Sequence, residues 1–531
     1  MWIQRTFPPT AAPLSGREIM EGLHGWFNEG RAEEKLKKEL CDYFDVPDCW
    51  LVSSGKAALT LIIKAIHSLS PGKKSVLMCA YTCYSVASSV VKAGLSVALS
   101  DIDPDTLDFD YALLESQLTG QTLCLVINHL LGRPADLDHC RALARSKGIW
   151  VVEDAAQAMG AVYQGKTAGT RGDVGFFSLG RGKVICAVEG GIIVTRNPDI
   201  AAALQREYQK LPPYTGQEKA ILLAKAIALV CFLRPSLYWL PDHLPFLKLG
   251  QTEFSTSFSL KRMSGFQCGL MRRWREKLAR LNHARLERTQ LYYKLLGQGP
   301  IDQRSADHRL PGQGSPDNML LDHRPPGQTL LNHRLTGAMI SPHRRPIDAV
   351  PSRLRLREAV PYSVGPIDAV PYSLGQLNAV PCNQGLLEAI RSDLGLFEIV
   401  PANPAPTEAV AVSMMLAGAV PSCAGLLDAV PSNLPPGHQS EPEPLPFLRF
   451  PLIVEDPEKR ERLYQLARRQ GLGISRMYPD SIDAIAQLED QVIRGNYPAA
   501  RKLAQTLLTL PTHPLISAKD QKRVIRLIRG R

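Results

Sequence analysis

The sequence lacks the cysteine patterns of a disulfide framework or a structural zinc site. Its eleven cysteines are an odd number, and none is spaced as CxxC or has a histidine partner at zinc spacing. The N-terminal stretch MWIQRTFPPT is not an apolar leader. The most apolar run, near residues 220–232, is broken by Lys225 and is too short to span a bilayer. These absences predict a protein of the reduced cytoplasm that holds no metal.

What is present is the composition of a folded, water-soluble chain. The 531 residues are 45% hydrophobic and 7% aromatic, which excludes an intrinsically disordered chain and allows two or three domains. The formal net charge is +11, and the basic residues are densest in 272–288 and in the C-terminal KDQKRVIRLIRGR. Solvated helix faces and a basic tail account for them better than nucleic-acid binding does. Anionic substrates or an anionic membrane surface stay open.

The first part of the chain, up to about residue 196, alternates strand-like and helical patterns. The expected strands are 75–80, 96–102, 122–130, 148–156 and 190–196. Helices are expected between them, for example over 57–69 and over 137–148, where Gly148 is a helix stop. This alternation predicts an α/β domain with a mainly parallel sheet, whose functional loops lie at the carboxyl ends of the strands.

The next part, 197–297, reads as helical. Its apolar run is followed by RPSLYWLP, with Arg, Tyr and Trp at the edge of the run. Two interpretations of the segment 220–240 remain open. It is either a buried or dimer-interface helix, or a peripheral contact with a membrane surface.

A decapeptide repeat follows, from about residue 301 to 435. Units such as IDAVP, REAVP and LDAVP recur every ten residues, and most contain a proline, which blocks long helices and central strands. The step is shorter than the usual solenoid unit of about 20 to 50 residues. We interpret the tract as a flexible insert in a loop, with a binding module as the alternative.

After the repeat, strand and helix patterns resume, as expected of a small α+β domain. The chain is therefore divided into a large α/β domain with a helical extension (1–297), a low-complexity insert (298–440) and a small C-terminal domain (441–531). Without the insert about 390 residues remain, a suitable size for two domains.

Two motifs carry chemistry: EDAAQAMGA at 153–161 and FFSLGRGKVI at 176–185. Pyridoxal 5′-phosphate (PLP) needs a lysine for covalent attachment, a carboxylate beside its pyridine nitrogen and a polar nest for its phosphate. Asp154 can supply the carboxylate and Lys183 the amine. Ser178 and the turn SSGKAAL, which opens a helix, offer phosphate donors. The order of these groups and their places at strand ends predict a PLP site.

The same residues carry a resemblance to a known family. Seven ordered blocks look like the DegT/DnrJ/StrS family of PLP-dependent sugar aminotransferases: SSGKAAL, DIDPDTLDFD, NHLLGRPADLD, VVEDAAQAMGAVYQGKTAGTRGDVGFFSLGRGK, VEGGIIVT, RMSGFQCGL and LPTHP. The similarity runs through the chain except for the repeat and about 205–255. It implies the aspartate-aminotransferase type of fold (fold type I), in a homodimer whose active sites lie at the subunit interface.

Carried over by position, the resemblance implies a role for each matching residue. Lys183 would be the Schiff-base lysine, and Asp154 the partner of the pyridine nitrogen. Gln157 would contact the ring hydroxyl of PLP. Ser178, Gly55 and the residue after Gly55 would hold the phosphate.

The sequence also departs from the family pattern. Lys56 stands after Gly55 where the family usually has Thr, so its side chain either pairs with the phosphate or points away. The ring-stacking aromatic aligns with Cys83; of the tyrosines beside it, Tyr81 and Tyr84, we assign the stacking role to Tyr84. The NHG segment of many members is absent.

The resemblance implies a transaminase (EC 2.6.1 type). The amino donor would be glutamate and the acceptor a nucleotide-linked keto sugar, in polysaccharide or related biosynthesis. A sugar dehydratase of the same family is one alternative, but a histidine replaces the lysine in those enzymes, and Lys183 argues against it. The other alternative is a non-catalytic binding protein built around the repeats.

Overall fold

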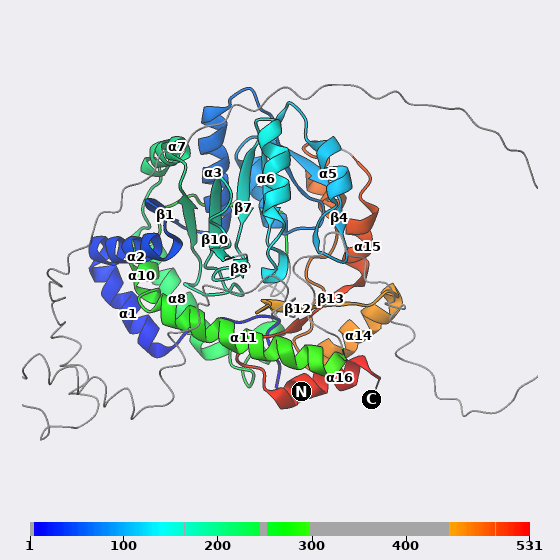
Figure 1. Ribbon diagram of the computed structural model, residues 1–531. Helices are drawn as coiled ribbons and strands as arrows, with labels where there is room; N and C mark the ends of the chain where they lie inside the picture. The colour runs from blue at the N-terminus through cyan, green and yellow to red at the C-terminus, as the bar shows by residue number, and fades with distance from the viewer. Residues whose placement is uncertain (1–4, 164, 245–251, 298–444, 494, 531) are drawn as a thin grey trace, which may run out of the picture. The chain divides into compact units, whose positions relative to one another are not determined.

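The computed structural model of the chain describes residues 5–163, 165–244, 252–297, 445–493 and 495–530 (Figure 1). These residues belong to one compact unit. The repeat of the predicted insert, 298–440, lies outside the described residues. The assignment of 1–297 and 441–531 to separate domains stays a prediction.

The centre of the described unit is a sheet of seven strands in the order β1-β11-β10-β7-β6-β2-β3. Neighbours from β10 to β3 run parallel, whereas β11 is antiparallel to both β10 and β1. The strands are β1 (Asp48–Val52), β2 (Ser75–Cys79), β3 (Ser96–Ser100), β6 (Thr122–Asn128), β7 (Trp150–Asp154), β10 (Val174–Ser178) and β11 (Gly191–Thr195). Short pairs are β4 (Ile102–Asp103) with β5 (Asp108–Phe109), and β8 (Val162–Tyr163) with β9 (Lys166–Thr167). The predicted mainly parallel sheet is confirmed.

The five predicted strands correspond to β2, β3, β6, β7 and β11. The pattern did not predict β1 as a strand, and it treated the segment of β10 only as part of a motif. Both are five residues long and buried along almost their whole length. Strands covered on both faces lack the alternation that marks a half-exposed strand, so they are difficult to recognise.

Helices cover the sheet, as Figure 1 shows for α3, α5 and α6. The helices of this part are α1 (Gly16–Phe27), α2 (Glu29–Phe44), α3 (Gly55–Leu69), α4 (Tyr84–Lys92), α5 (Tyr111–Gln117) and α6 (Leu137–Ser146), with a 3₁₀ turn at η1 (Leu130–Gly132). The hydroxyl of Ser54 caps α3 by accepting from Ala57 N at 3.1 Å. The predicted stop after α6 is confirmed, since Gly148 adopts a positive φ of 60°.

The predicted helical part consists of α7 (Pro198–Gln209), α8 (Gly216–Phe232), α9 (Trp239–Asp242), α10 (Gly265–Leu270) and α11 (Trp274–Leu296). Residues 252–261 between α9 and α10 are not helical, which corrects the prediction for that stretch. The end of the stretch lies beside the end of β1, where Ser53 N donates to Lys261 O at 2.9 Å and Val52 pairs with Arg262.

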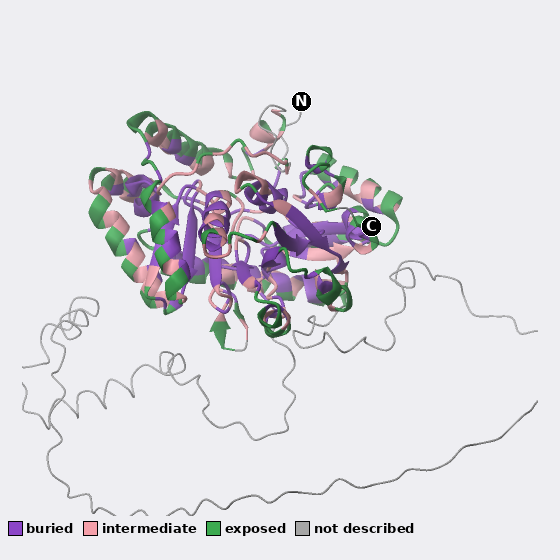
Figure 2. Cartoon of the chain, turned by 90° about the horizontal axis from the view of Figure 1, so that it is seen from above, coloured by how far each residue is buried: buried purple, intermediate pink, exposed green. Residues whose placement is uncertain are grey.

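The C-terminal segment contains a two-stranded antiparallel sheet, β12 (Arg449–Ile453) with β13 (Leu507–Pro511). Its helices are α14 (Pro457–Arg469), α15 (Pro498–Thr506) and α16 (Ala518–Ile528), with 3₁₀ turns η5 (Ile482–Ala484) and η6 (Ala486–Leu488). Leu508 and Phe450 of this sheet belong to the same hydrophobic core as Val126 of β6. Figure 2 shows the buried strands at the centre of the described unit.

Candidate active site

Three neighbouring strands end with polar side chains at one edge of the sheet. Asn128 ends β6, Asp154 ends β7 and Ser178 ends β10. Asn128 and Asp154 stand opposite each other in the parallel register, and Phe176 of β10 stands opposite Asp154 on its other side. Carboxyl ends of parallel strands share one edge, so the structure brings the predicted Asp154 and Ser178 to the same side of the sheet.

Asp154 is a buried carboxylate, only 4% exposed. Its Oδ2 accepts from Asn128 Nδ2 at 2.8 Å, and its Oδ1 accepts from Ala156 N at 3.0 Å. Burial raises the pKa of the Asp154 carboxyl above its usual range, and the nearby Lys183 ammonium opposes that shift. A cation placed against Asp154 would therefore be strongly held.

Lys183 lies in the loop between β10 and β11 and is half-buried. Within the described part of the chain, its amine has neither a hydrogen bond nor an ion pair, although it interacts electrostatically with Asp154. The next residue, Val184, is fixed by Arg285 of α11, which is fully buried and donates from Nη2 to Val184 O at 2.9 Å. The lysine thus stands on an anchored loop with its amine free.

A cradle forms where the start of α3 meets the end of β10. A Cβ added to Gly55 would lie 2.8 Å from Ser178 Cβ and 3.0 Å from Ser178 Oγ, so only glycine allows this approach. A Cβ on Gly191, opposite Ser178 in the register, would lie 2.4 Å from Ser54 O. The first N–H groups of α3 and the Ser178 hydroxyl therefore converge, which is the arrangement of an anion site at a helix N-terminus.

Lys56 follows Gly55, but its ammonium lies 4.5 Å from the centre of the Phe258 ring. Lys92 approaches the same ring at 4.7 Å and donates to Thr256 O at 2.9 Å. Burial lowers the pKa of Lys56; the nearby Cys83 opposes this shift, and the repulsion from Lys92 adds to it. Of the two orientations left open by the sequence, the structure therefore has Lys56 turned towards Phe258.

The remaining predicted residues lie against the C-terminal segment. Gln157 accepts from Leu131 N at 3.2 Å and donates from Nε2 to the Tyr478 hydroxyl at 2.9 Å. The Tyr84 hydroxyl is bound to the backbone of Asp480, donating to its O at 3.2 Å and accepting from its N at 3.1 Å. The roles of Gln157 and Tyr84 towards a cofactor ring stay predictions.

The sequence did not identify a buried pair that supports the site. Glu153 is fully buried and contacts His129 Nε2 at 3.0 Å, while His129 Nδ1 accepts from Ala135 N at 3.1 Å. Glu153 also accepts from Gly169 N at 2.7 Å. Burial opposes ionisation of Glu153, but the bond to His129 and the backbone N–H groups hold its pKa below its usual range. The position of Glu153 directly before Asp154 could have indicated this role. Successive side chains of a strand point to opposite faces, so Glu153 and Asp154 lie on opposite faces of β7.

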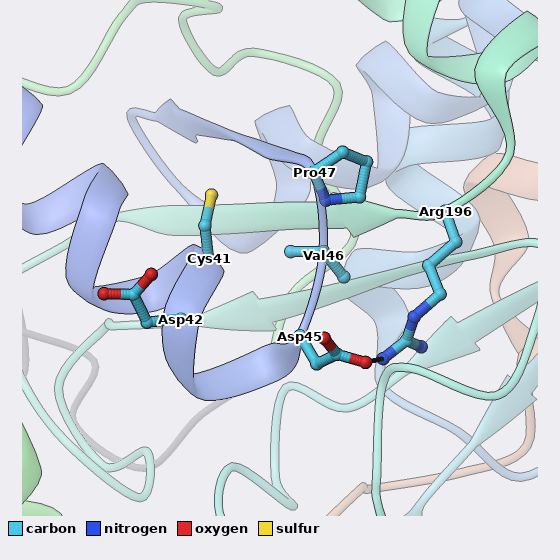
Figure 3. A pocket seen from close by; sticks show the side chains of 6 residues that line it. All are labelled: Cys41, Asp42, Asp45, Val46, Pro47 and Arg196. Atoms are coloured by element: carbon cyan, nitrogen blue, oxygen red, sulfur yellow. Dashed lines mark hydrogen bonds and ion pairs between the residues drawn. The ribbon is translucent and has the colours of Figure 1, made fainter. Parts of the chain in front are cut away.

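Figure 3 shows a surface depression away from these residues, lined by Cys41, Asp42, Asp45, Val46, Pro47 and Arg196. An ion pair of 3.2 Å joins Arg196 to Asp45 at its edge. None of the predicted site residues lines it, and we assign it no role. The described residues also contain no group of three or more His, Cys, Asp or Glu side chains arranged to hold a metal.

The donor set at the sheet edge fits PLP. A free amine (Lys183), a buried carboxylate with a raised pKa (Asp154) and an N-terminal helix cradle closed by Ser178 are the three groups that this cofactor requires. They come from separate elements and meet at one edge.

Comparison with curated proteins finds relatives that each match a little over a third of the chain. GDP-perosamine synthase of Caulobacter vibrioides is 36% identical over 201 residues, covering 37% of this chain and 54% of the relative. L-glutamine:2-deoxy-scyllo-inosose aminotransferase of Streptomyces kanamyceticus is 36% identical over 213 residues, covering 39% and 49%. The chain spans about half the length of the curated relatives it matches.

Solved structures share the fold at low sequence identity. An aminotransferase from Psychrobacter cryohalolentis has a TM-score of 0.55 and 16% identity, covering 97% of this chain and 96% of its own. Helicobacter pylori PseC, an aminotransferase, has a TM-score of 0.58 and 11% identity, covering 99% and 98%. The fold is therefore of the aminotransferase type. A family profile matches residues 17–219 and 423–529, more than half of the sequence, and the chain belongs to the DegT/DnrJ/EryC1/StrS aminotransferase family.

Proposed function

We propose that this protein is a PLP-dependent transaminase that transfers an amino group from an amino acid to a keto sugar. One observation carries the proposal. The buried Asp154 carboxylate and the free Lys183 amine lie within electrostatic reach without forming an ion pair, next to an anion cradle. A bound ring with a cationic nitrogen and a phosphate would use all three features.

PLP, when bound, supplies an electron sink for the bond that breaks at the donor's Cα. Lys183 would hold the cofactor through Nζ, and the same amine would move a proton as general base and then acid. Asp154 would keep the ring nitrogen protonated, because a cation beside the carboxylate offsets the cost of burying the negative charge of Asp154. Its bond to Asn128 fixes the orientation of the carboxylate.

The remaining residues bind the cofactor. Ser178 and the N–H groups of Gly55 and Lys56 hold the phosphate, with the Lys56 side chain turned away to Phe258. Gln157, held by Leu131 and Tyr478, contacts the ring hydroxyl. Tyr84 covers the ring face.

The substrate class follows from the family. The names of relatives, GDP-perosamine synthase and a spore coat polysaccharide biosynthesis protein of Bacillus subtilis, support a sugar acceptor and a role in polysaccharide biosynthesis. We propose glutamate as the donor and a nucleotide-linked keto sugar as the acceptor. The dehydratase alternative is disfavoured because Lys183 occupies the position where those enzymes carry histidine.

The test is covalent attachment of the cofactor. The purified chain, incubated with PLP, should absorb in the visible region. Borohydride should remove that band and leave the cofactor's mass on the peptide that contains Lys183. A colourless protein, or a label on another lysine, would contradict the proposal and favour the non-catalytic alternative.

Helix α8 also presents exposed apolar side chains, which we propose as an interaction surface. Ile221, Ile227 and Phe232 are 48%, 47% and 38% exposed, although Leu222 and Ala226 on the opposite face are buried. None of the described helices has the length and hydrophobicity needed to span a membrane. Between 220 and 240 the charged residues are Arg234 and Lys225, and Lys225 pairs with Glu189 at 3.5 Å. This combination favours a peripheral contact with an anionic membrane surface.

Flotation with vesicles of phosphatidylcholine and phosphatidylserine tests the surface. Wild-type protein should float with these vesicles, and Ile221→Gln combined with Ile227→Gln should stay at the bottom. A matched control replaces Leu113 of α5, which is 43% exposed, with Gln. If wild-type protein never floats but the double variant dissociates a dimer in solution, α8 belongs instead to the interface of the proposed cytoplasmic homodimer.

A further inference from the structure

Arg449, the first residue of β12, is a guanidinium without an acid partner in the described part of the chain. Its Nη1 lies 3.5 Å from Ser475 Oγ, at the limit of a hydrogen bond. Its Nε is buried and has no hydrogen-bond partner. Arg449 as a whole is half-buried, and the burial of part of its guanidinium lowers its pKa.

Two tyrosines surround this cation and offer further donors. The rings of Tyr81 and Tyr478 are 5.3 Å apart, and Arg449 interacts electrostatically with both. The Tyr81 hydroxyl is buried and makes no hydrogen bond of normal geometry. The Tyr478 hydroxyl accepts from Gln157 and has no acceptor for its own proton within the described chain. Two donors of the cluster, Arg449 Nε and the Tyr81 hydroxyl, therefore lack an acceptor in the described part of the chain.

The cluster lies beside the proposed cofactor site. Tyr478 touches Gln157 directly and interacts electrostatically with Asp154. Arg449 also interacts with Cys83, the residue that aligns with the ring-stacking aromatic. The C-terminal segment thus places an uncompensated positive charge against the wall of the site.

Buried donors without partners, here Arg449 Nε and the Tyr81 hydroxyl, are costly unless an acceptor pairs with them. The phosphate cradle of Gly55 and Ser178 is built from different residues, so it leaves the Arg449 cluster unused. A guanidinium flanked by hydroxyl donors matches a carboxylate or phosphate group, which accepts two or more hydrogen bonds.

We propose that Arg449, with Tyr81 and Tyr478, forms a second oxyanion site that binds an anionic group of a substrate. The site rests on the proposed function, because its ligand is presented beside the cofactor. Two sources carry the same chemistry: a carboxylate of the amino donor and a phosphate of the acceptor.

Calorimetry on the full chain loaded with PLP tests the site with two probes. Glutarate has the carboxylates of a donor but no amine, and pyrophosphate has the phosphates of a nucleotide-linked acceptor. Arg449→Met should weaken binding of at least one probe tenfold or more, and Arg449→Lys should weaken it less. Loss of glutarate binding identifies the donor as the source, and loss of pyrophosphate binding identifies the acceptor.

The control is Arg476→Met, since Arg476 is an arginine of the same segment that already has an acid partner, Glu461, at 3.4 Å. Its replacement should leave both affinities unchanged. If wild-type protein binds neither probe, or Arg449→Met binds both as well as wild type does, the proposal is overturned.

Thermal unfolding separates binding from a structural role. Without added anion, Arg449→Met should melt at or above the wild-type temperature, because a partly buried charge without an acid partner is removed. A lower Tm with unchanged probe affinity would make Arg449 structural and overturn the site. Borohydride labelling of Lys183 in the same variant should persist. Labelling that fails in wild type overturns the proposed function, whereas failure of the probes alone overturns only the Arg449 site.

Discussion

Ser178, at the end of β10, packs directly on the backbone of Gly55, the first residue of α3. A Cβ at position 55 would lie 2.8 Å from Ser178 Cβ, closer than real Cβ atoms approach other atoms. The contact joins residues 123 positions apart and shapes the proposed phosphate cradle. It also makes the cradle sensitive to a single methyl group.

Gly55→Ala should weaken PLP binding by tenfold or more while the protein remains folded, because the new methyl group forces Ser178 away from the N-terminus of α3. Fluorescence titration with PLP measures the affinity. Gly30→Ala is the control, since a Cβ there meets nothing within 4 Å. Equal affinities in the two variants would place the phosphate elsewhere.

Lys183→Ala should abolish covalent attachment of the cofactor. Turnover should fall by roughly 10² to 10⁴-fold from the lost proton transfer alone. The fold should persist, because the Lys183 side chain has no hydrogen bond or ion pair in the described part of the chain. Mass spectrometry after borohydride reduction and a coupled assay with glutamate give the two readouts. Exposed Lys166→Ala serves as the control. Near-normal turnover in Lys183→Ala would remove this residue from the mechanism.

Asp154→Asn should stabilise the cofactor-free protein at neutral pH and impair the loaded one. Burial raises the pKa of Asp154 in the folded state, so its ionisation costs folding free energy at every pH above the unfolded value. The amide removes that cost, on the order of 1 kcal/mol or more, but cannot hold a ring nitrogen protonated. Thermal melts with and without PLP test both parts, with the exposed Asp42→Asn as control. A cofactor-free Tm below that of wild type would contradict the argument.

His513 should make the protein sensitive to mild acid. Burial, with Arg285 and Arg288 nearby, lowers its pKa from 6.5 to about 4. The unfolded chain takes up a proton below pH 6.5 and the folded chain does not, so stability falls as pH drops from 6.5 to 4. The loss amounts to about 3 kcal/mol for this shift. Urea titrations across this range should be flatter for His513→Gln and unchanged for His283→Gln, whose side chain is 74% exposed. If the free energy of unfolding depends on pH in the same way for His513→Gln and wild type, His513 is not the source of the acid sensitivity.

Excision of the decapeptide tract should leave the enzyme intact. Joining about Gly299 to about Glu441 with a few flexible residues removes a loop-closure cost on the order of 2 to 3 kcal/mol. The shortened protein should bind PLP with equal or greater thermal stability and unchanged turnover. Failure to fold, or folding without activity, would make the tract a structural part of the protein.

The sequence by itself determined the α/β alternation, the family and the residues at strand ends. These follow from local patterns: apolar runs predict strands, a Ser-Gly turn predicts the start of a helix, and motif order predicts Asp154 and Lys183 as site residues. Where covering elements remove the alternation, as in β1 and β10, the local signal was insufficient.

Only the tertiary structure decided which distant side chains meet. Tyr478 contacts Gln157 across 321 positions, and Lys56 turns to Phe258. Arg449 lies half-buried near two tyrosines, with no acid partner among the described residues. No local pattern encodes such contacts, because they depend on how the C-terminal segment packs into the core shared with the sheet. Burial then shifts the pKa values of the charged groups: it raises that of Asp154 and lowers that of Arg449. The size of each shift depends on the neighbours that the fold supplies, because a charge removed from water is stabilised only by them.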